Sequence, residues 1–204
     1  MAGSDVQAVF ITADTNAVDA ASVAAAARPN TDFTIDGTDT DGGVATFAAG
    51  RIITCTTAGT GDNGKTVTLT GTDVNGDSQT EVITLTGSAT AHAGSKYFKT
   101  ITAASASAQP AANVSIGMAA GAADVIFAGR SRLKGAYIVN SGTAGTLDFL
   151  TTSPTGTSVM KLGTVASATV TRDVHIPEEG VLFTNGIYVQ YTVATFTTIT
   201  GFHA

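Results

Sequence analysis

The sequence has few charged residues. Asp, Glu, Lys and Arg together make up 13% of its 204 positions, and Trp is absent. Globular proteins usually carry about 25% charged residues. The surface must therefore be covered mainly by Thr, Ser, Gly, Ala and Asn, which lose less hydration free energy than ions when another protein covers them. Because Lys and Glu are also scarce in protein interfaces, this composition favours an assembly subunit over a free enzyme.

Positive charge is especially scarce, with 10 Lys and Arg against 16 Asp and Glu and a net charge of -6. Nucleic-acid binding requires a basic stripe that releases counterions, so this balance argues against a nucleic-acid partner. The one local basic group is Arg130, Arg132 and Lys134, whose spacing of two predicts one face of a strand or its approach. Phosphate binding, a solvated strand edge and an inter-subunit ion pair are its possible roles, the last two being commoner.

Cysteine and long apolar runs are also nearly missing. Cys55 is the single cysteine, which excludes an internal disulfide, and its apolar surroundings at 51–55 predict a buried thiol instead of a nucleophile. The longest apolar run, at 23–27, is too short to cross a membrane, and residues 1–5 lack the basic start of a signal peptide. We therefore expect no membrane partner and a protein made and folded in a cytoplasm.

What the sequence does contain is short alternating segments of Val, Ile, Thr, Phe and Tyr, separated by Gly, Asn, Asp and Ser about every ten residues. This pattern predicts an all-β fold with two small antiparallel β-sandwich or barrel-like domains. A small-residue linker near 118–123 divides a first domain at 31–120 from a second at 121–204. Residues 1–30 are expected to form an arm or, over the Ala-rich segment 16–28 before Pro29, a short helix.

The clearest local unit is a hairpin of residues 65–70 and 79–86. Asn75 and Gly76 are expected to supply the positive φ angles of its turn. Alternation places Val67, Leu69, Ile83 and Leu85 on one face. Further strands are predicted at 97–101, 114–118, 133–140, 146–150, 159–162, 169–176, 181–183, 187–193 and 197–202.

Two acidic groups qualify as candidate calcium ligands, because hard cations prefer clustered oxygen atoms. The first group is Asp73, Asn75, Asp77 and Glu81, and the second is Asp36, Asp39 and Asp41. The first matches poorly, since Gly76 falls at the fourth position of the loop and Asn-Gly already explains a turn. The second is expected to be a solvated acidic loop.

The remaining candidates for chemistry are three histidines, His92, His175 and His203, none at metal-ligand spacing from another or from Cys55. Each is expected to be an ordinary surface or edge residue. The glycine-rich stretch 59–64 precedes a strand, so no helix dipole is available for phosphate, and we expect a turn. No catalytic, cofactor-binding or metal-binding residue is therefore assigned, and no cofactor is expected.

Residues 66–76, 81–85, 96–102 and 114–117 resemble a module of minor virion proteins of tailed bacteriophages. Segments 133–142 and 180–189 are similar to another small β-domain of the same kind of gene. Together these resemblances span most of residues 50–204. They imply a virion structural protein with no catalytic pattern.

The resemblance, with the low charge, leads to the hypothesis of a capsid decoration or cement protein that binds and stabilises the major capsid protein lattice. Self-association as a trimer or dimer is expected, with residues 1–30 serving as an arm on a neighbour. Such a protein would be assembled in the host bacterial cytoplasm and reside in the virion. The alternatives are a tail, neck or baseplate component, including an adsorption protein, and a receptor- or glycan-binding module.

Overall fold

A computed structural model describes residues 6–12, 19–118, 123–153, 156–166, 169, 171–191 and 195–204. Strands and turns account for these residues, so the predicted all-β, antiparallel fold is confirmed. No helix in this part of the chain has the length and apolarity needed to cross a membrane. The chain divides into two compact units. We call residues 16–121 the inserted unit, and residues 1–15 with 122–204 the split unit.

The described residues of the inserted unit form seven strands in one hydrogen-bonded network. They are β2 (Ala24–Ala27), β3 (Thr40–Asp41), β4 (Val44–Thr57), β5 (Thr66–Thr72), β6 (Ser78–Thr84), β7 (Ala91–Ala106) and β8 (Val114–Met118). The order β4-β7-β5-β6 forms the main sheet, β8 pairs with β4 and with β2, and β3 pairs with β4. All of these pairs are antiparallel.

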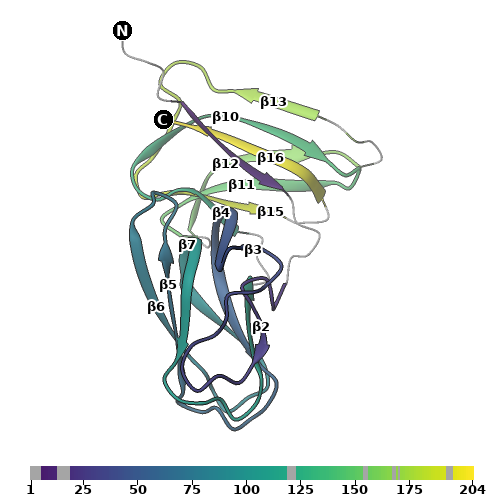
Figure 1. Ribbon diagram of the computed structural model, residues 1–204. Helices are drawn as coiled ribbons and strands as arrows, with labels where there is room; N and C mark the ends of the chain where they lie inside the picture. The colour runs from purple at the N-terminus through teal and green to yellow at the C-terminus, as the bar shows by residue number, and fades with distance from the viewer. Residues whose placement is uncertain are drawn as a thin grey trace. The chain divides into compact units, whose positions relative to one another are not determined.

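The two longest strands, β4 and β7, run side by side and organise the core of this unit (Figure 1). Their register shifts between Thr46 and Arg51, where a bulge frees the carbonyl of Ala48 to accept a hydrogen bond from Lys99 Nζ at 2.7 Å. Strand β7 pairs with β4 over residues 91–101 and with β5 over residues 100–106. The core contains the buried residues Val23, Phe33, Phe47, Ile53, Cys55, Val67, Leu69, Ile83, Leu85, Phe98, Ile101, Val114 and Ile116.

The predicted hairpin corresponds to β5 and β6, with Val67 opposite Ile83. All four residues predicted to share a face are buried, so that prediction is confirmed. One detail is wrong: only Gly76 has a positive φ, of 85°, and Asn75 does not. The turn is closed by Asp73, whose Oδ1 accepts the amides of Asn75 and Asp77 at 2.8 and 3.0 Å. The Asp73 side chain thus stabilises the turn without a positive φ angle at Asn75.

In the split unit, the described residues form nine strands in two sheets. They are β1 (Gln7–Thr12), β9 (Ala123–Phe127), β10 (Ser131–Asn140), β11 (Gly145–Thr151), β12 (Thr157–Thr164), β13 (Thr171–His175), β14 (Val181–Phe183), β15 (Ile187–Tyr191) and β16 (Phe196–His203). One sheet has five strands in the order β1-β16-β10-β13, with β14 also pairing with β10. The other runs β12-β11-β15-β9.

These two sheets pack face to face, as Figure 1 shows for β10 and β16 above β11 and β15. Gly201 of β16 meets Ile126 of β9, because a Cβ atom at Gly201 would lie 2.5 Å from Ile126 Cδ1. Phe196 makes an edge-to-face contact with Tyr191, their ring centroids 6.1 Å apart. Alternate residues of each sheet fill the interior, as in a β-sandwich. Ile187, Val189 and Tyr191 of β15 are all buried. Val193, in the predicted strand 187–193, lies outside the described residues.

The N-terminal thirty residues differ most from expectation. Residues 7–12 form β1, which pairs with β16 in the split unit, and residues 24–27 form β2, which pairs with β8 in the inserted unit. The helical alternative is therefore wrong for 24–27. Tertiary pairing overrides alanine's helix preference here, because Ala24 is fully buried in the core. Strand β9 was not predicted, and residues 119–122 of the expected linker lie outside the described part.

Candidate functional site

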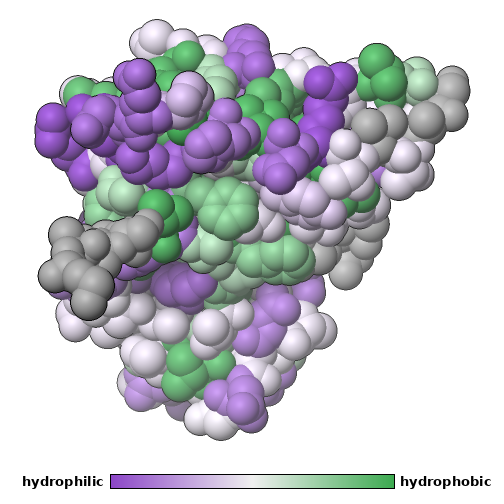
Figure 2. All heavy atoms as spheres, turned by 90° about the horizontal axis from the view of Figure 1, so that it is seen from above, coloured by the Kyte–Doolittle hydropathy of each residue, from purple (hydrophilic) through white to green (hydrophobic). Residues whose placement is uncertain are grey.

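The outer face of the five-stranded sheet is polar but carries few charges. The strand register aligns two rows of residues across it, each running from β1 to β13. One row is Ala8, Phe202, Gly135 and His175, and the other is Phe10, Thr200, Tyr137 and Asp173. Successive residues of a strand point to opposite faces, and Ile11, Ile199 and Ile138, which form the next row after Phe10, Thr200 and Tyr137, are buried. Phe10 is 52% exposed. Figure 2 looks onto this face, where green hydrophobic side chains lie among purple hydrophilic ones.

A groove of about 580 Å³ runs along this face. Its lining includes Val6, Phe202, Gly135, His175 and Glu178. Gly135 is one of the lining residues. A Cβ atom there would lie 2.6 Å from the carbonyl oxygen of Val174, so the close approach of β13 to β10 requires glycine at this position. Val6, His175 and Glu178 are exposed, so the groove is open along its rim.

The predicted basic group lies at the start of β10, and its Lys134 lines the groove. Arg132 Nη1 donates to the carbonyl of Glu179 at 3.4 Å, and its Nε lies 3.7 Å from the Glu179 carboxylate. Lys134 Nζ donates to the carbonyl of Glu178 at 3.1 Å. Two of the three cations thus hold the turn before β14, and Arg130 is exposed. Phosphate binding and an inter-subunit ion pair stay predictions.

The three histidines lie on separate stretches of strand. His175 is exposed on β13, as expected, whereas His92 is half-buried on β7 opposite Cys55. The surface prediction is wrong for His203, which is 4% exposed and packs against Phe127 with ring centroids 5.0 Å apart. Burial lowers the pKa of His203, so its ring is neutral at physiological pH. The surface prediction fails because His203 belongs to β16 and has the same parity as the buried Ile199, so its side chain points inward.

The two acidic groups are dispersed by the fold. Asp73 caps the hairpin turn, and Asp36 accepts the amide of Ala25 at 3.0 Å. Among the described residues, no three His, Cys, Asp or Glu side chains gather closely enough to hold a metal ion. Neither Asp36 nor Asp41 is buried, which agrees with a solvated loop.

Glu81 leaves the predicted calcium loop altogether and lies on the core face of β6, opposite Leu69. It is 7% exposed. Its Oε1 accepts hydrogen bonds from the Ser95 amide at 2.5 Å, the Ser95 hydroxyl at 2.9 Å and the Lys96 amide at 3.1 Å. Gly94 makes room for it, since a Cβ atom there would lie 2.3 Å from Glu81 Oε2. Glu81 has the same parity along β6 as Ile83, so period-two alternation allowed an inward position that its charge argued against.

Cys55 is fully buried in the core of the inserted unit, as predicted. Burial, together with the smaller effect of the Glu81 charge, raises the pKa of the thiol to about 12. The thiol is therefore protonated and shielded from solvent at neutral pH. Because it is the single cysteine of the chain, its chemical labelling reports the unfolding of the inserted unit.

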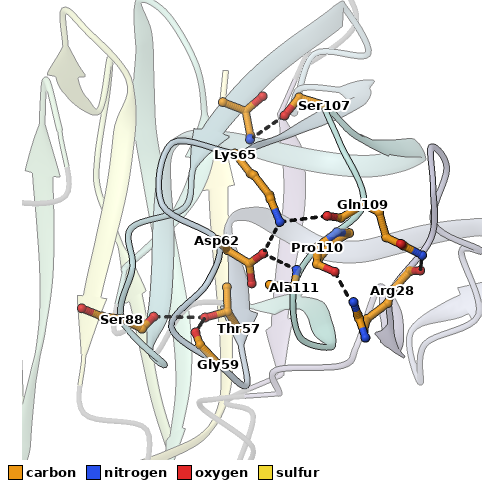
Figure 3. Close-up of polar contacts among 11 residues, drawn as sticks. Arg28, Thr57, Gly59, Asp62, Lys65, Ser88, Ser107, Gln109, Pro110 and Ala111 are labelled. Carbon is orange, nitrogen blue, oxygen red and sulfur yellow. Dashed lines mark hydrogen bonds and ion pairs between the residues drawn. The ribbon is translucent and has the colours of Figure 1, made fainter.

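A polar cluster at one end of the inserted unit centres on Asp62, which sequence analysis overlooked within the predicted turn 59–64. Asp62 is 0% exposed, its Oδ1 lies 3.0 Å from Lys65 Nζ, and it accepts the amide of Ala111 (Figure 3). Burial by itself would raise the pKa of Asp62. The amides of Ala111 and Ala112 and the Lys65 ammonium outweigh it and hold the pKa below its usual value.

The same cluster joins segments far apart in the sequence. Lys65 Nζ also donates to the carbonyl of Gln109 at 2.9 Å, and Arg28 Nε donates to the carbonyl of Pro110 at 2.8 Å (Figure 3). Gln109 Nε2 donates in return to the carbonyl of Arg28 at 3.3 Å. Charged donors thus satisfy the carbonyl groups of the loop between β7 and β8, which fixes this end of the unit.

We expect Asp62→Asn to lower the free energy of unfolding of the inserted unit by about 2 kcal/mol near neutral pH, because Lys65 and the amides lose a charged acceptor. The pKa of Asp62 is lower in the folded protein than its ordinary value of 3.8. The ionised carboxylate therefore stabilises the fold above about pH 3.8, and this stabilisation is lost as the pH falls through the folded-state pKa. The difference between the two proteins should therefore shrink below about pH 4. Urea unfolding followed by circular dichroism checks this. A constant difference down to about pH 2 contradicts the ion-pair assignment.

No protein-family model, curated protein or solved structure matches this chain, so its candidate surfaces are interpreted from their own geometry.

Proposed function

We propose that this chain is a structural protein of a bacteriophage virion, a decoration or cement protein that binds the major capsid protein lattice and stabilises it. The outer face of the five-stranded sheet carries the proposal. Its two central rows contain one carboxylate residue, Asp173, one histidine, His175, and no Lys or Arg, while Phe10, Tyr137 and Phe202 supply apolar area. A neighbour can cover such a face without removing many ions from water.

Two further observations support this function. The groove beside Phe202 suits a protruding side chain of the lattice, and Tyr and Phe are frequent anchors of protein interfaces. The net charge of -6 disfavours a place against packaged nucleic acid. Because a lattice presents many equivalent sites, a subunit that self-associates gains avidity without a strong single contact.

Thr200→Glu is expected to weaken binding to expanded, protein-emptied capsid heads at least tenfold, because it puts a charge in the middle of the outer face. Thr200 is half-buried on the interior strand β16, between Phe10 and Tyr137. Co-sedimentation with heads measures the binding. Val82→Glu is the matched control, since Val82 is 58% exposed on the inserted unit, and it should bind as the unmodified protein does.

The copy number per virion separates this proposal from its alternative. Hundreds of copies by quantitative mass spectrometry agree with a head lattice. A dozen or fewer copies, with binding to isolated tails and none to heads, would replace the cement function with a tail, neck or baseplate function.

A further inference from the structure

Strand β1 is an unusual sheet edge. It forms one edge of the five-stranded sheet, and among the described residues it pairs with β16 alone. Its six residues contain no charge, proline or glycine. An edge strand of this kind presents unpaired main-chain N–H and C=O groups that can accept another strand.

The other long edge strands of the described chain are protected against such pairing. Strand β6 carries the inward-pointing Glu81, β12 carries Lys161, and β13 carries Arg172 and Asp173. Charges on an edge, and charges that point inward from it, are common devices that prevent edge-to-edge association. Strand β1 has neither kind of charge, so among these edge strands it is the one without this protection.

We propose that β1 is the surface through which two copies of this chain associate, by antiparallel pairing of β1 with β1 about a twofold axis at Ala8. This inference deepens the proposed function, whose self-association it assigns to a named strand. Pairing about Ala8 places Val6 of each copy opposite Phe10 of the other. These residues have the same parity as Ala8, so they share the outer face in both copies and the two sheets become continuous.

The exposed side chains fit a second copy of the same strand. Val6 is 41% exposed and Phe10 is 52% exposed. In the dimer, Val6 of each copy lies opposite Phe10 of the other, so the contact occurs twice. Aromatic and β-branched residues form favourable cross-strand pairs, and the small Ala8 lies at the axis. The opposite edge is unsuited to the same arrangement, because pairing centred on Asp173 of β13 would bring two carboxylates together.

The pairing also extends to the groove. Val6 forms part of the groove lining, so Phe10 of the second copy would cover the end of the groove nearest to β1. The second copy thus buries apolar surface that the isolated chain leaves in water, in addition to forming a new set of main-chain hydrogen bonds.

Disulfide cross-linking of Ala8→Cys tests this geometry. Directly opposite residues of an antiparallel pair have Cα atoms about 4.5–5.5 Å apart, which lies within the range that a disulfide spans. Mild oxidation should convert most of the variant into a covalent dimer. Thr171→Cys, on the edge strand β13, should stay monomeric on denaturing gels, and the buried Cys55 is unreactive in both. Equal cross-linking of the two variants would overturn the proposal.

Sedimentation velocity of the full chain without capsid heads provides the second test. We expect a dimer whose dissociation constant rises at least tenfold in Ala8→Lys, which places two ammonium groups at the axis, and stays unchanged in Thr171→Lys. A monomer at high concentration, or a dimer that Ala8→Lys leaves intact, would rule out β1 as the dimer interface. Since heads are absent, failure here leaves binding to the lattice to be judged by co-sedimentation alone.

Discussion

Replacing Gly71 with Ala is expected to destabilise the inserted unit by about 3 kcal/mol. A Cβ atom at this position would lie 1.9 Å from the carbonyl oxygen of Thr100, a main-chain atom of β7. Thr100 is held from both sides, because it pairs with Thr46 of β4 and Thr72 of β5. The strand cannot retreat without loss of one of these pairings.

Labelling of the Cys55 thiol in urea measures this effect, since the thiol becomes reactive when the inserted unit opens. Gly163→Ala is the matched control. Gly163 also lies within a strand, β12, and a Cβ atom there meets nothing within 4 Å. Because Cys55 labelling reports only the inserted unit and Gly163 lies in the split unit, both glycine variants are also followed by circular dichroism in urea. The unfolding midpoint of Gly163→Ala should equal that of the unmodified protein. If both variants behave alike, close packing of β5 against β7 is not what requires glycine at 71.

Replacing Glu81 with Ala is the second substitution with a large expected effect, again about 3 kcal/mol. The change removes an acceptor of three hydrogen bonds from Ser95 and Lys96 and leaves space on the core face beside Leu69. Glu81→Gln retains an acceptor oxygen at the same distance and should cost about 1 kcal/mol, because only the charge is lost.

The order of the two Glu81 variants distinguishes a buried hydrogen-bonding role from a surface one. Val82→Ala serves as the control, because Val82 is the next residue on β6 and its side chain is exposed, so the labelling midpoint should hardly change. Equal, small effects of Glu81→Ala and Val82→Ala would contradict the inward position of the carboxylate. A labelling rate for Cys55 that rises in Glu81→Ala without urea would show local opening around β6.

Local alternation explains where sequence analysis succeeded. The hairpin of β5 and β6 joins neighbours in sequence, so its apolar residues and its Asn-Gly turn are sufficient to predict it. Strand β8 was predicted with the bounds Val114–Met118 that the structure has. The predicted strand 97–101 is only part of the longer β7. Sequence analysis missed its beginning because the polar residues His92 and Lys96 interrupt the apolar pattern there.

Non-local pairing explains where it failed. Strands β1 and β2 pair with β16 and β8, each about a hundred or more residues away, and nothing in the Ala-rich N-terminal segment indicates such partners. Asp62 was overlooked for the same reason: the Ala111 amide that it accepts comes from a loop 49 residues further along the chain. A lone Asp in a glycine-rich turn does not reveal that it is buried.

The sequence by itself determined the all-β class, the faces of the hairpin, the burial of Cys55 and the weakly charged character of the surface, because these depend on composition and on the period of two along a strand. Only the tertiary structure decided that the N-terminal segment is split between two units, that Glu81 and Asp62 are buried, and that β1 is an uncharged edge. Whether a strand lies at an edge depends on which distant strands pair, and the free energy of those pairings comes from the packed sheet as a whole.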